Sequence, residues 1–162
     1  MQYTSYMEVI KMLDFENMDK RLIAYVNIFV CANRLQAIMD KGMEDVTARQ
    51  WLVLTMLGAF PEPPTLKQIS ELSGVTHQSM RQITDRLEEK GLIKIVPDER
   101  DGRAIRLVKT EAAEKIRERD TARNYGFVFE LFSCLDETEA AVFCSALEKL
   151  CGKLNELKES TL

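Results

Sequence analysis

The sequence predicts a mainly α-helical protein that carries one small β-hairpin near its middle. Apolar residues recur at helical spacing over most of the 162 residues, in segments that begin at capping residues. Strand-forming residues gather instead in two short runs, 92–96 and 103–108, which the turn-forming stretch Pro-Asp-Glu-Arg-Asp-Gly separates. Hydrophobic residues make up 46% of the chain and charged residues 30%, which is typical of one globular domain spanning residues 1–162.

The first segment, residues 1–45, is expected to form helices that pack against a second copy of the chain. A short amphipathic helix is predicted over Tyr3–Leu13 and a long helix over Lys20–Asp40. Residues 22–32 contain Asn27 as their only strongly polar residue. A helix that is apolar nearly all round must be buried nearly all round, which one small domain does not achieve alone. Because this apolar run is shorter than the roughly 20 residues of a membrane span, no membrane contact is expected.

A capping box predicts the next helix. The side chains of Thr47 and Gln50 are spaced to accept hydrogen bonds from each other's backbone N–H groups, which begins a helix that runs to Gly58. The stretch Pro61–Pro64 then forms a rigid extended connector, because proline fixes its own backbone and restricts the residue before it.

Two short helices joined by a tight turn are expected between residues 65 and 91. Thr65 and Gln68 form a capping box that begins the first helix, and Gly74 ends it because glycine accepts a left-handed backbone. Thr76 caps the second helix, which ends at Gly91. Apolar residues at three- and four-residue spacing form the inward faces: Leu66, Ile69 and Leu72 in the first helix, and Met80, Ile83 and Leu87 in the second.

These helices and the hairpin together predict a winged helix-turn-helix over residues 46–110, with the hairpin as the wing. The small residue Ser70 lies where the second helix crosses the first. The second helix directs polar side chains outward, where the major groove of DNA can receive them.

The run from about Val46 to Ile116 resembles the winged helix-turn-helix of the multiple-antibiotic-resistance regulator (MarR) family. The closest matching segments are DRLEEKGLI, residues 85–93, and DERDGRAIRLVKTE, residues 98–111. The family's Asp-x-Arg wing element corresponds to residues 101–103, followed by an aliphatic strand and Thr110. Lys109 stands where leucine is common in the family, and Ala113 where glycine is common. The resemblance implies a two-fold dimer whose terminal helices form a base that holds two DNA-reading heads.

The second helix and the wing supply the candidate DNA-binding residues. Gln78 and Gln82 can pair bidentately with adenine and Arg81 with guanine, whereas residues at the helix start suit phosphates or base edges. The resemblance implies that Arg103 enters the minor groove. Asp101 is acidic and is repelled by phosphate, so we expect it to hold the wing loop in shape from within. The full candidate set is Thr76, His77, Gln78, Ser79, Arg81, Gln82, Arg86, Arg100 and Arg103.

Charge is distributed unevenly, in a way that favours nucleic acid as the partner. The formal net charge is −4, which by itself argues mildly against DNA binding. Residues 65–110, however, include nine lysines and arginines and seven acidic residues, so this region is mildly positive. The acidic excess lies in the rest of the chain. The mildly positive region is therefore the predicted reading element, and a dimer presents two of them.

The C-terminal segment, residues 111–162, is expected to complete the dimerisation base. A long helix is predicted from Thr110 to Cys134, and a capping signal at Asp136 and Glu139 begins the last helix. This last helix carries a seam of apolar residues with coiled-coil-like spacing, namely Phe143, Leu147, Leu150, Leu154 and Leu157.

The resemblance also implies that a small aromatic effector binds between the dimer helices and the reading head. Four residues are candidates to line such an effector pocket, although each also suits plain core packing. They are Phe29, Trp51, Met56 and Phe127.

Catalytic, metal and redox sites find little support in the sequence. His77 is the single histidine and lies at the start of the predicted reading helix, so no Ser-His-Asp or Cys-His arrangement is available without it. No metal-ligand spacing or phosphate loop is present, and neither a cofactor nor an enzymatic activity is expected. The four cysteines, Cys31, Cys134, Cys144 and Cys151, are interpreted as core-packing thiols rather than redox sensors.

The sequence therefore predicts a dimeric DNA-binding transcriptional regulator, a ligand-responsive repressor of a palindromic operator. The N-terminus has no secretory pattern, so a cytoplasmic location is expected. The alternative is a winged-helix protein-interaction module that binds no specific DNA sequence.

Overall fold

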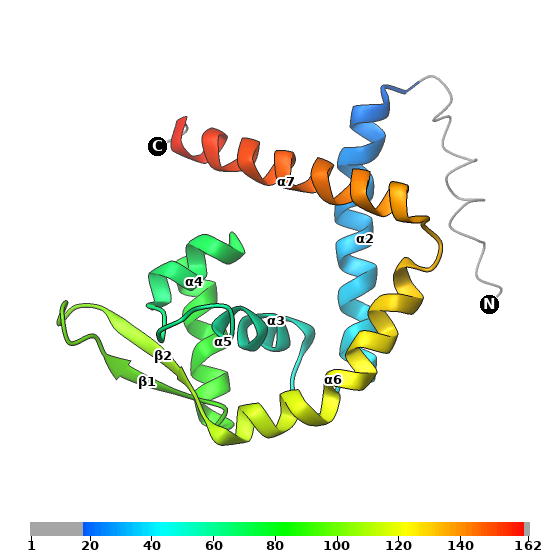
Figure 1. The fold of residues 1–162 in the computed structure, drawn as a ribbon. Coiled ribbons are helices and arrows are strands. Elements are labelled where there is room, and N and C mark those ends of the chain that lie inside the picture. Colours follow the sequence, from blue (N-terminus) through cyan, green and yellow to red (C-terminus); the bar gives the residue numbers. More distant parts are fainter. Residues whose placement is uncertain (1–17, 161–162) are drawn as a thin grey trace, which may run out of the picture. The chain divides into compact units, whose positions relative to one another are not determined.

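The computed structural model describes residues 18–160, and Figure 1 shows the arrangement of their helices and strands within each part of the chain. The chain divides after Thr110 into two compact units, which are described separately. The helix predicted over residues 3–13 lies outside the described residues.

The first unit begins with helix α2 (Lys20–Gly42), whose predicted extent is confirmed. The side chain of Asp19 caps it by accepting a hydrogen bond from the backbone N–H of Arg21 at 2.8 Å. None of the α2 residues is buried. By length and composition alone, α2 is apolar enough to cross a membrane. The expectation that its apolar segment is too short was wrong, because the helix continues well beyond residue 32 with further apolar residues.

Helices α3 (Ala48–Leu57) and α4 (Leu66–Ser73) begin at the predicted capping boxes. In each box the threonine side chain accepts from the backbone N–H of the glutamine, and the glutamine side chain accepts from the threonine N–H. Gly74 ends α4 with φ of +70°, the left-handed conformation that its sequence position predicted. Leu66 and Ile69 are buried as predicted, but Leu72 is 55% exposed, so the apolar stripe of α4 is shorter than expected.

Helix α5 (His77–Glu89) begins at Thr76, whose side chain accepts from the backbone N–H of Ser79 at 3.2 Å. Gly91 follows its end with φ of +70°. The N–H groups of Gly91 and Leu92 donate to the carbonyls of Glu88 and Leu87, which is the Schellman arrangement of a helix end. This end confirms the predicted position of Gly91.

Strands β1 (Ile93–Pro97) and β2 (Ile105–Lys109) pair antiparallel, with Ile93 opposite Lys109 and Pro97 opposite Ile105. Both strands begin later than predicted. Leu92 is not part of β1 because its N–H donates to the carbonyl of Leu87 at the end of α5. Ala104 stays in the loop because its N–H donates to the carbonyl of Asp101 at 2.8 Å.

The hydrophobic core of the first unit lies among α3, α4, α5 and the hairpin. Ile69, Met80 and Leu87 have no accessible surface, which pins the two helices of the helix-turn-helix together. Ser70 is buried at the same place and donates its hydroxyl to the carbonyl of Leu66. The other buried apolar residues of this unit are Val46, Ala48, Val53, Leu57, Pro64, Leu66, Leu92, Ile93 and Leu107.

The second unit consists of α6 (Glu111–Phe132) and α7 (Glu137–Ser160). Asp136 and Glu139 form the predicted reciprocal cap, with hydrogen bonds of 2.8 and 3.0 Å. Helix α6 begins after Thr110 rather than at it, because the Thr110 hydroxyl donates to the carbonyls of Gly91 and Leu92. The predicted seam of α7 is exposed along its whole length, from 36% at Leu147 to 63% at Leu154.

The four cysteines are exposed, so the expectation that they pack in the core is wrong for a single chain. The reason is their position, since Cys31 lies in α2 and the others lie in or next to α6 and α7. Large apolar side chains of these helices remain exposed among residues 18–160.

Candidate nucleic-acid interface

Helix α5 presents the polar side chains that the sequence selected on an exposed face. Thr76, His77 and Gln78 are exposed at its start, and Arg81, Gln82 and Arg86 are exposed along it. Ser79 is half-buried, and its hydroxyl accepts a hydrogen bond from the Thr76 hydroxyl at 2.9 Å. The opposite face of α5 is held in the core by Met80 and Leu87, while Ile83 is half-buried. The helix is therefore fixed by one face and available on the other.

Arg81 is held along the surface of α5 by a neighbouring carboxylate. Its Nε lies 2.8 Å from Oδ1 of Asp85, one helical turn later, and both side chains are a little under half exposed. The pair leaves the guanidinium at the surface. Asp85 was not selected from the sequence as a site residue, although its spacing of four residues from Arg81 is the signal that marks such a pair.

The wing loop is organised around Asp98, which the sequence analysis missed. Oδ1 of Asp98 accepts from the backbone N–H groups of Arg100 and Asp101 at 2.7 and 2.9 Å, and Oδ2 pairs with the guanidinium of Arg106. These two backbone N–H groups, together with Arg106, hold the pKa of the Asp98 carboxyl below its usual value, despite burial. The spacing Asp98-x-Arg100 in a Pro-Asp turn was the available signal, because aspartate commonly accepts from the N–H two residues on.

Asp101, which was expected from its charge to hold the wing, makes fewer of the loop's hydrogen bonds than Asp98 does. Its Oδ1 accepts from the backbone N–H of Arg103 at 3.0 Å, and its side chain is exposed. The main organiser is Asp98 because its carboxylate is buried and accepts from two N–H groups and one guanidinium. Arg100 and Arg103 are both exposed at the hairpin tip, as a DNA-contacting role requires.

The hairpin is also tied to the helix-turn-helix. Arg106 donates from a terminal nitrogen to the carbonyl of Pro63 at 2.6 Å, and the N–H of Leu107 donates to the carbonyl of Pro64 at 2.9 Å. On the other strand, the N–H of Ile95 donates to the Glu88 side chain at 2.7 Å. The wing and α5 are therefore parts of one connected surface within the first unit.

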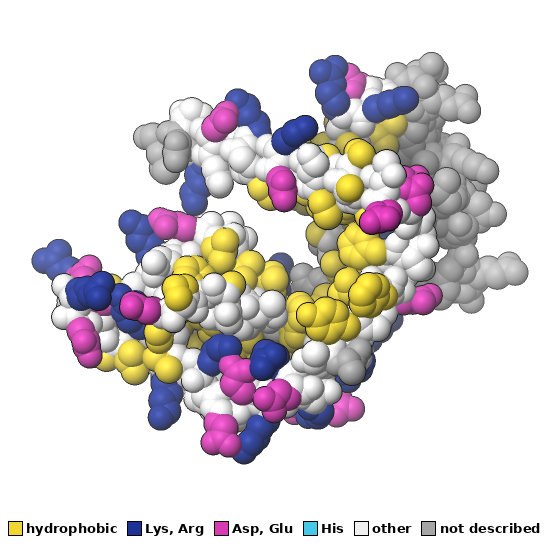
Figure 2. Space-filling model, viewed as in Figure 1, with side chains coloured by type: hydrophobic (Ala, Val, Ile, Leu, Met, Phe, Trp, Pro, Cys, Tyr) yellow, Lys and Arg dark blue, Asp and Glu magenta, His cyan; other side chains and the backbone are white. Residues whose placement is uncertain are grey.

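The charges on this unit are mixed. On the face that Figure 2 shows, lysine and arginine side chains are interspersed with aspartates and glutamates around the hairpin instead of forming a patch of one sign. Binding to a polyanion therefore depends on where individual arginines lie, and the wing tip and α5 each expose two of them, Arg100 and Arg103 on the wing and Arg81 and Arg86 on the helix.

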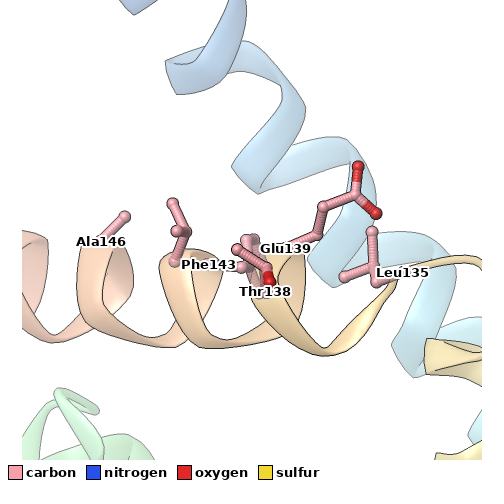
Figure 3. Close-up of a pocket in the computed structure, with 6 residues that line it drawn as sticks. Leu135, Thr138, Glu139, Phe143 and Ala146 are labelled. Carbon is pink, nitrogen blue, oxygen red and sulfur yellow. The ribbon is translucent and has the colours of Figure 1, made fainter.

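The predicted effector residues are not gathered at the pocket that the structure shows. Phe29 is 57% exposed and contacts Tyr25 edge-on within α2, while Trp51 and Met56 of α3 and Phe127 of α6 are half-buried. A shallow, mostly apolar pocket lies instead over the first turns of α7 (Figure 3). Its lining residues are Leu135, Thr138, Glu139, Val142, Phe143 and Ala146.

Among residues 18–160, no group of three or more histidines, cysteines, aspartates and glutamates is placed to hold a metal ion. The single histidine, His77, is exposed on α5 with the candidate DNA-binding residues.

The chain is similar to known proteins in sequence and in fold. Residues 44–104 match the MarR family. The HTH-type transcriptional regulator YpoP of Bacillus subtilis (strain 168) is 24% identical over 139 residues, which cover 86% of this chain and 92% of YpoP. The S. aureus MepR–DNA complex is 25% identical with a TM-score of 0.73, over 80% of this chain and 97% of MepR.

A third similar structure is the organohalide-sensing regulator RdhR-CbdbA1625 in its 2,4-dichlorophenol-bound form. It is 16% identical with a TM-score of 0.75, over 86% of this chain and 84% of that chain, which is a likeness of fold. The matched segment 44–104 contains α3, α4, α5, β1 and the wing loop described above. The segment that carries the helix-turn-helix and the wing loop therefore matches the MarR family, and most of the chain is similar to a transcriptional regulator and to a protein solved in complex with DNA.

Proposed function

We propose that this protein is a homodimeric regulator that binds a palindromic DNA operator and represses transcription until a small aromatic effector releases it. One observation carries the DNA-binding part: the first unit fixes α5 by its apolar face and exposes its polar face, beside a hairpin anchored to the same helix. A major-groove helix and a wing are the two parts that such a reader needs.

The residue roles follow from chemistry. Arg81 presents a planar fork that suits the O6 and N7 acceptors of guanine, and Gln78 and Gln82 present amides that suit adenine. Thr76, His77 and Ser79 lie at the positive N-terminal end of α5, which suits phosphate oxygens or base edges. Arg86 suits the DNA backbone. On the wing, Arg103 and Arg100 suit the minor groove, where narrow A·T-rich sequence concentrates negative potential.

The dimer is proposed because of the uncovered apolar surface of three helices. No residue of α2 is buried, and Tyr25, Phe29 and Ile38 each expose more than half of their surface. Helix α7 exposes its predicted seam, and α6 exposes Tyr125 and Phe129. Burying a large apolar side chain stabilises by about 1.5–3 kcal/mol, so a second copy covering these faces supplies a strong driving force. Residues 20–45 and 111–160 are therefore proposed as the dimerisation helices, and residues 46–110 as the DNA-binding part.

A second copy is proposed rather than a membrane as the cover for α2. YpoP and RdhR-CbdbA1625 are transcriptional regulators and MepR was solved in complex with DNA, and the exposed charges on both units of this chain suit water. A two-fold dimer presents two α5 helices to successive major grooves, which implies half-sites about one helical turn apart. A cytoplasmic location is part of the same proposal.

The effector part rests on the similarity to RdhR-CbdbA1625, whose structure contains 2,4-dichlorophenol. Phe29, Trp51, Met56 and Phe127 are proposed to line an aromatic site once the dimer has formed, since each retains accessible surface in the single chain. An effector that binds more tightly to the dimer at one separation of the two heads shifts the dimer toward that separation. The resulting change in DNA affinity is limited by the ratio of the effector's affinities for the two separations.

DNA binding is tested by selecting duplexes from random-sequence DNA with the purified protein and titrating the selected duplex at two salt concentrations. We expect affinity to fall steeply with salt, because phosphate contacts release counterions, and a scrambled duplex to bind more weakly. Equal binding of selected and scrambled duplexes, or none, would instead support the alternative of a protein-interaction module.

Repression and effector response are tested with the selected duplex placed over a promoter that drives a reporter. We expect the protein to lower reporter output, and a chlorinated phenol or aromatic acid to restore it and to weaken the duplex titration in vitro. A rise in output on adding the protein alone would show activation instead.

A further inference from the structure

We propose that Asp98 and Arg106 are positioning residues that form a wing latch, a pair that holds the hairpin loop in its DNA-contacting shape and ties it to the connector before α4. The inference rests on the proposed DNA-binding function and assigns these two residues a role in it. Neither residue belongs to the Asp-x-Arg element at 101–103 through which the wing resembles the MarR family.

The first half of the latch shapes the loop. The buried Asp98 carboxylate accepts from the N–H groups of Arg100 and Asp101, and the N–H of Asp98 donates to the carbonyl of Ala104 at 3.0 Å. These bonds fix the backbone from residue 98 to residue 104, which includes both exposed arginines of the tip. The direction in which Arg100 and Arg103 leave the backbone therefore depends on Asp98.

The second half of the latch ties the loop to the helix-turn-helix. The Arg106 guanidinium uses Nε for Asp98 and a terminal nitrogen for the carbonyl of Pro63. Thr65 and Arg106 also form an isolated antiparallel bridge, and Thr65 is the N-cap of α4. One side chain thus spans the wing loop and the residues that begin the first helix of the helix-turn-helix.

The exposure of the two latch residues separates them from the DNA-contacting residues. The Asp98 side chain is 4% exposed and the Arg106 side chain 25%, whereas Arg100 and Arg103 are exposed at the tip. A negative carboxylate repels phosphate, so Asp98 has no attractive contact to offer DNA directly. Both latch residues therefore act through the wing arginines.

Arginine is required at position 106 because bonding to both the Asp98 carboxylate and the Pro63 carbonyl needs two donors held at a fixed angle. A lysine ammonium is a single point of charge and does not present the planar fork that reaches a carboxylate and a carbonyl on different sides. Arg106→Lys is therefore expected to keep the net charge and lose the latch, which makes it a useful companion to Arg106→Gln.

The test is a double-variant cycle on the duplex that the parent selects from random-sequence DNA. Arg106→Gln is measured in the parent and in an Arg100→Ala/Arg103→Ala background, and Lys153→Gln on α7 controls for the loss of one positive charge. In the parent background we expect Arg106→Gln to weaken binding roughly tenfold and to flatten the salt dependence. In the background that lacks the wing arginines we expect almost no further weakening, because the residues through which Arg106 acts are gone. Lys153→Gln should bind within about twofold of the parent.

Several outcomes would overturn the latch. Equal weakening in both backgrounds would mean that Arg106 contacts DNA itself, and parent-like binding of Arg106→Gln would mean that it has no role. If Arg106→Gln does not fold by circular dichroism, Arg106→Lys takes its place in the same cycle.

Amide hydrogen exchange without DNA tests the geometry independently. We expect the Arg100 and Asp101 N–H groups to exchange faster in the folded Arg106 variant than in the parent, and unchanged exchange would contradict the latch. A parent protein that selects no duplex would overturn the proposed DNA binding, and this inference with it. A parent that binds while the cycle is additive overturns the latch alone.

Discussion

The side chain of Glu88 accepts a hydrogen bond from the backbone N–H of Ile95 at 2.7 Å, which joins the last turn of α5 to the first strand of the wing. Ile95 lies seven positions after Glu88, and the Schellman end of α5 lies between them. The helix that carries the candidate base-reading residues and the hairpin that carries the candidate wing residues are thereby linked by one side chain.

Removing this link should loosen the wing without unfolding the protein. Glu88→Ala leaves the Ile95 N–H without its acceptor, and we expect a loss of about 1 kcal/mol in the free energy of unfolding, measured by urea titration. Its exposed neighbour serves as the control, because Glu89→Ala removes the same charge from the same turn of α5. A cost as large for Glu89→Ala would show that charge, rather than the hydrogen bond, is responsible.

Base reading by α5 predicts a change of specificity in Arg81→Ala. We expect the variant to lose preference at one base position of the selected duplex, at a cost of about 1–3 kcal/mol for the preferred base. Binding to a panel of duplexes with single base-pair changes measures this. If all the duplexes lose affinity by the same factor, Arg81 contacts phosphate and does not read a base.

Asp85→Asn is the companion to that variant, because it removes the charge that holds Arg81 along the helix. We expect it to keep the base preference and to raise affinity for all duplexes, since a carboxylate near the phosphates has gone. Loss of the base preference in Asp85→Asn would show that the ion pair orients Arg81 for reading.

The proposed dimer predicts that a charge in the α7 seam separates the two copies. Leu147→Asp or Leu150→Asp introduces a carboxylate into the proposed interface, which should cost several kcal/mol of association free energy. Sedimentation measures the mass of each variant in solution. Lys149→Asp, which lies on a different side of the same helix turn, should stay dimeric. A folded monomer as the main species of the parent protein would contradict the dimer.

The buried carboxylate of Asp98 predicts a stability that depends on pH. The pKa of Asp98 is lowered in the folded protein, chiefly by the N–H groups of Asp101 and Arg100. Its contribution is therefore complete above the ordinary pKa of aspartate, about 3.9, and is lost as the pH falls through the lower folded value.

This dependence is measured by comparing the parent with Asp98→Asn. The difference in the free energy of unfolding between the two proteins should be largest near neutral pH and should shrink as the pH falls from about 5 through the lowered pKa of the folded protein. Asp101→Asn, at an exposed position of the same loop, provides the comparison. A difference that stays constant over this range would show that the Asp98 charge plays no part.

Arg103 on the wing is predicted to affect DNA binding without affecting the stability of the fold. We expect Arg103→Ala to leave the melting temperature nearly unchanged, because exposed charges contribute little to stability. It should weaken binding of the selected duplex and lower the slope of log affinity against log salt by about one unit per subunit. Parent-like affinity of this variant at physiological salt would show that the wing does not contact DNA.

Much of this fold is readable from the sequence because its signals are short-range. The boxes Thr47–Gln50 and Thr65–Gln68, and the pair Asp136 and Glu139, form between residues three apart. Gly74 and Gly91 adopt the left-handed conformation that their positions after helices indicate. The nearly uninterrupted apolarity of residues 22–32 likewise indicated a helix, and none of the residues of α2 is buried within the described part of the chain.

The tertiary structure decided what depends on residues distant in the chain. Asp98 organises the wing because it meets Arg106, and Arg106 in turn meets Pro63, which lies 43 residues earlier. Leu72 and the four cysteines stay exposed because the described residues of distant segments do not cover them. A hydrogen bond between neighbours in sequence follows from residue type and spacing, whereas one between distant segments exists only after packing has brought them together.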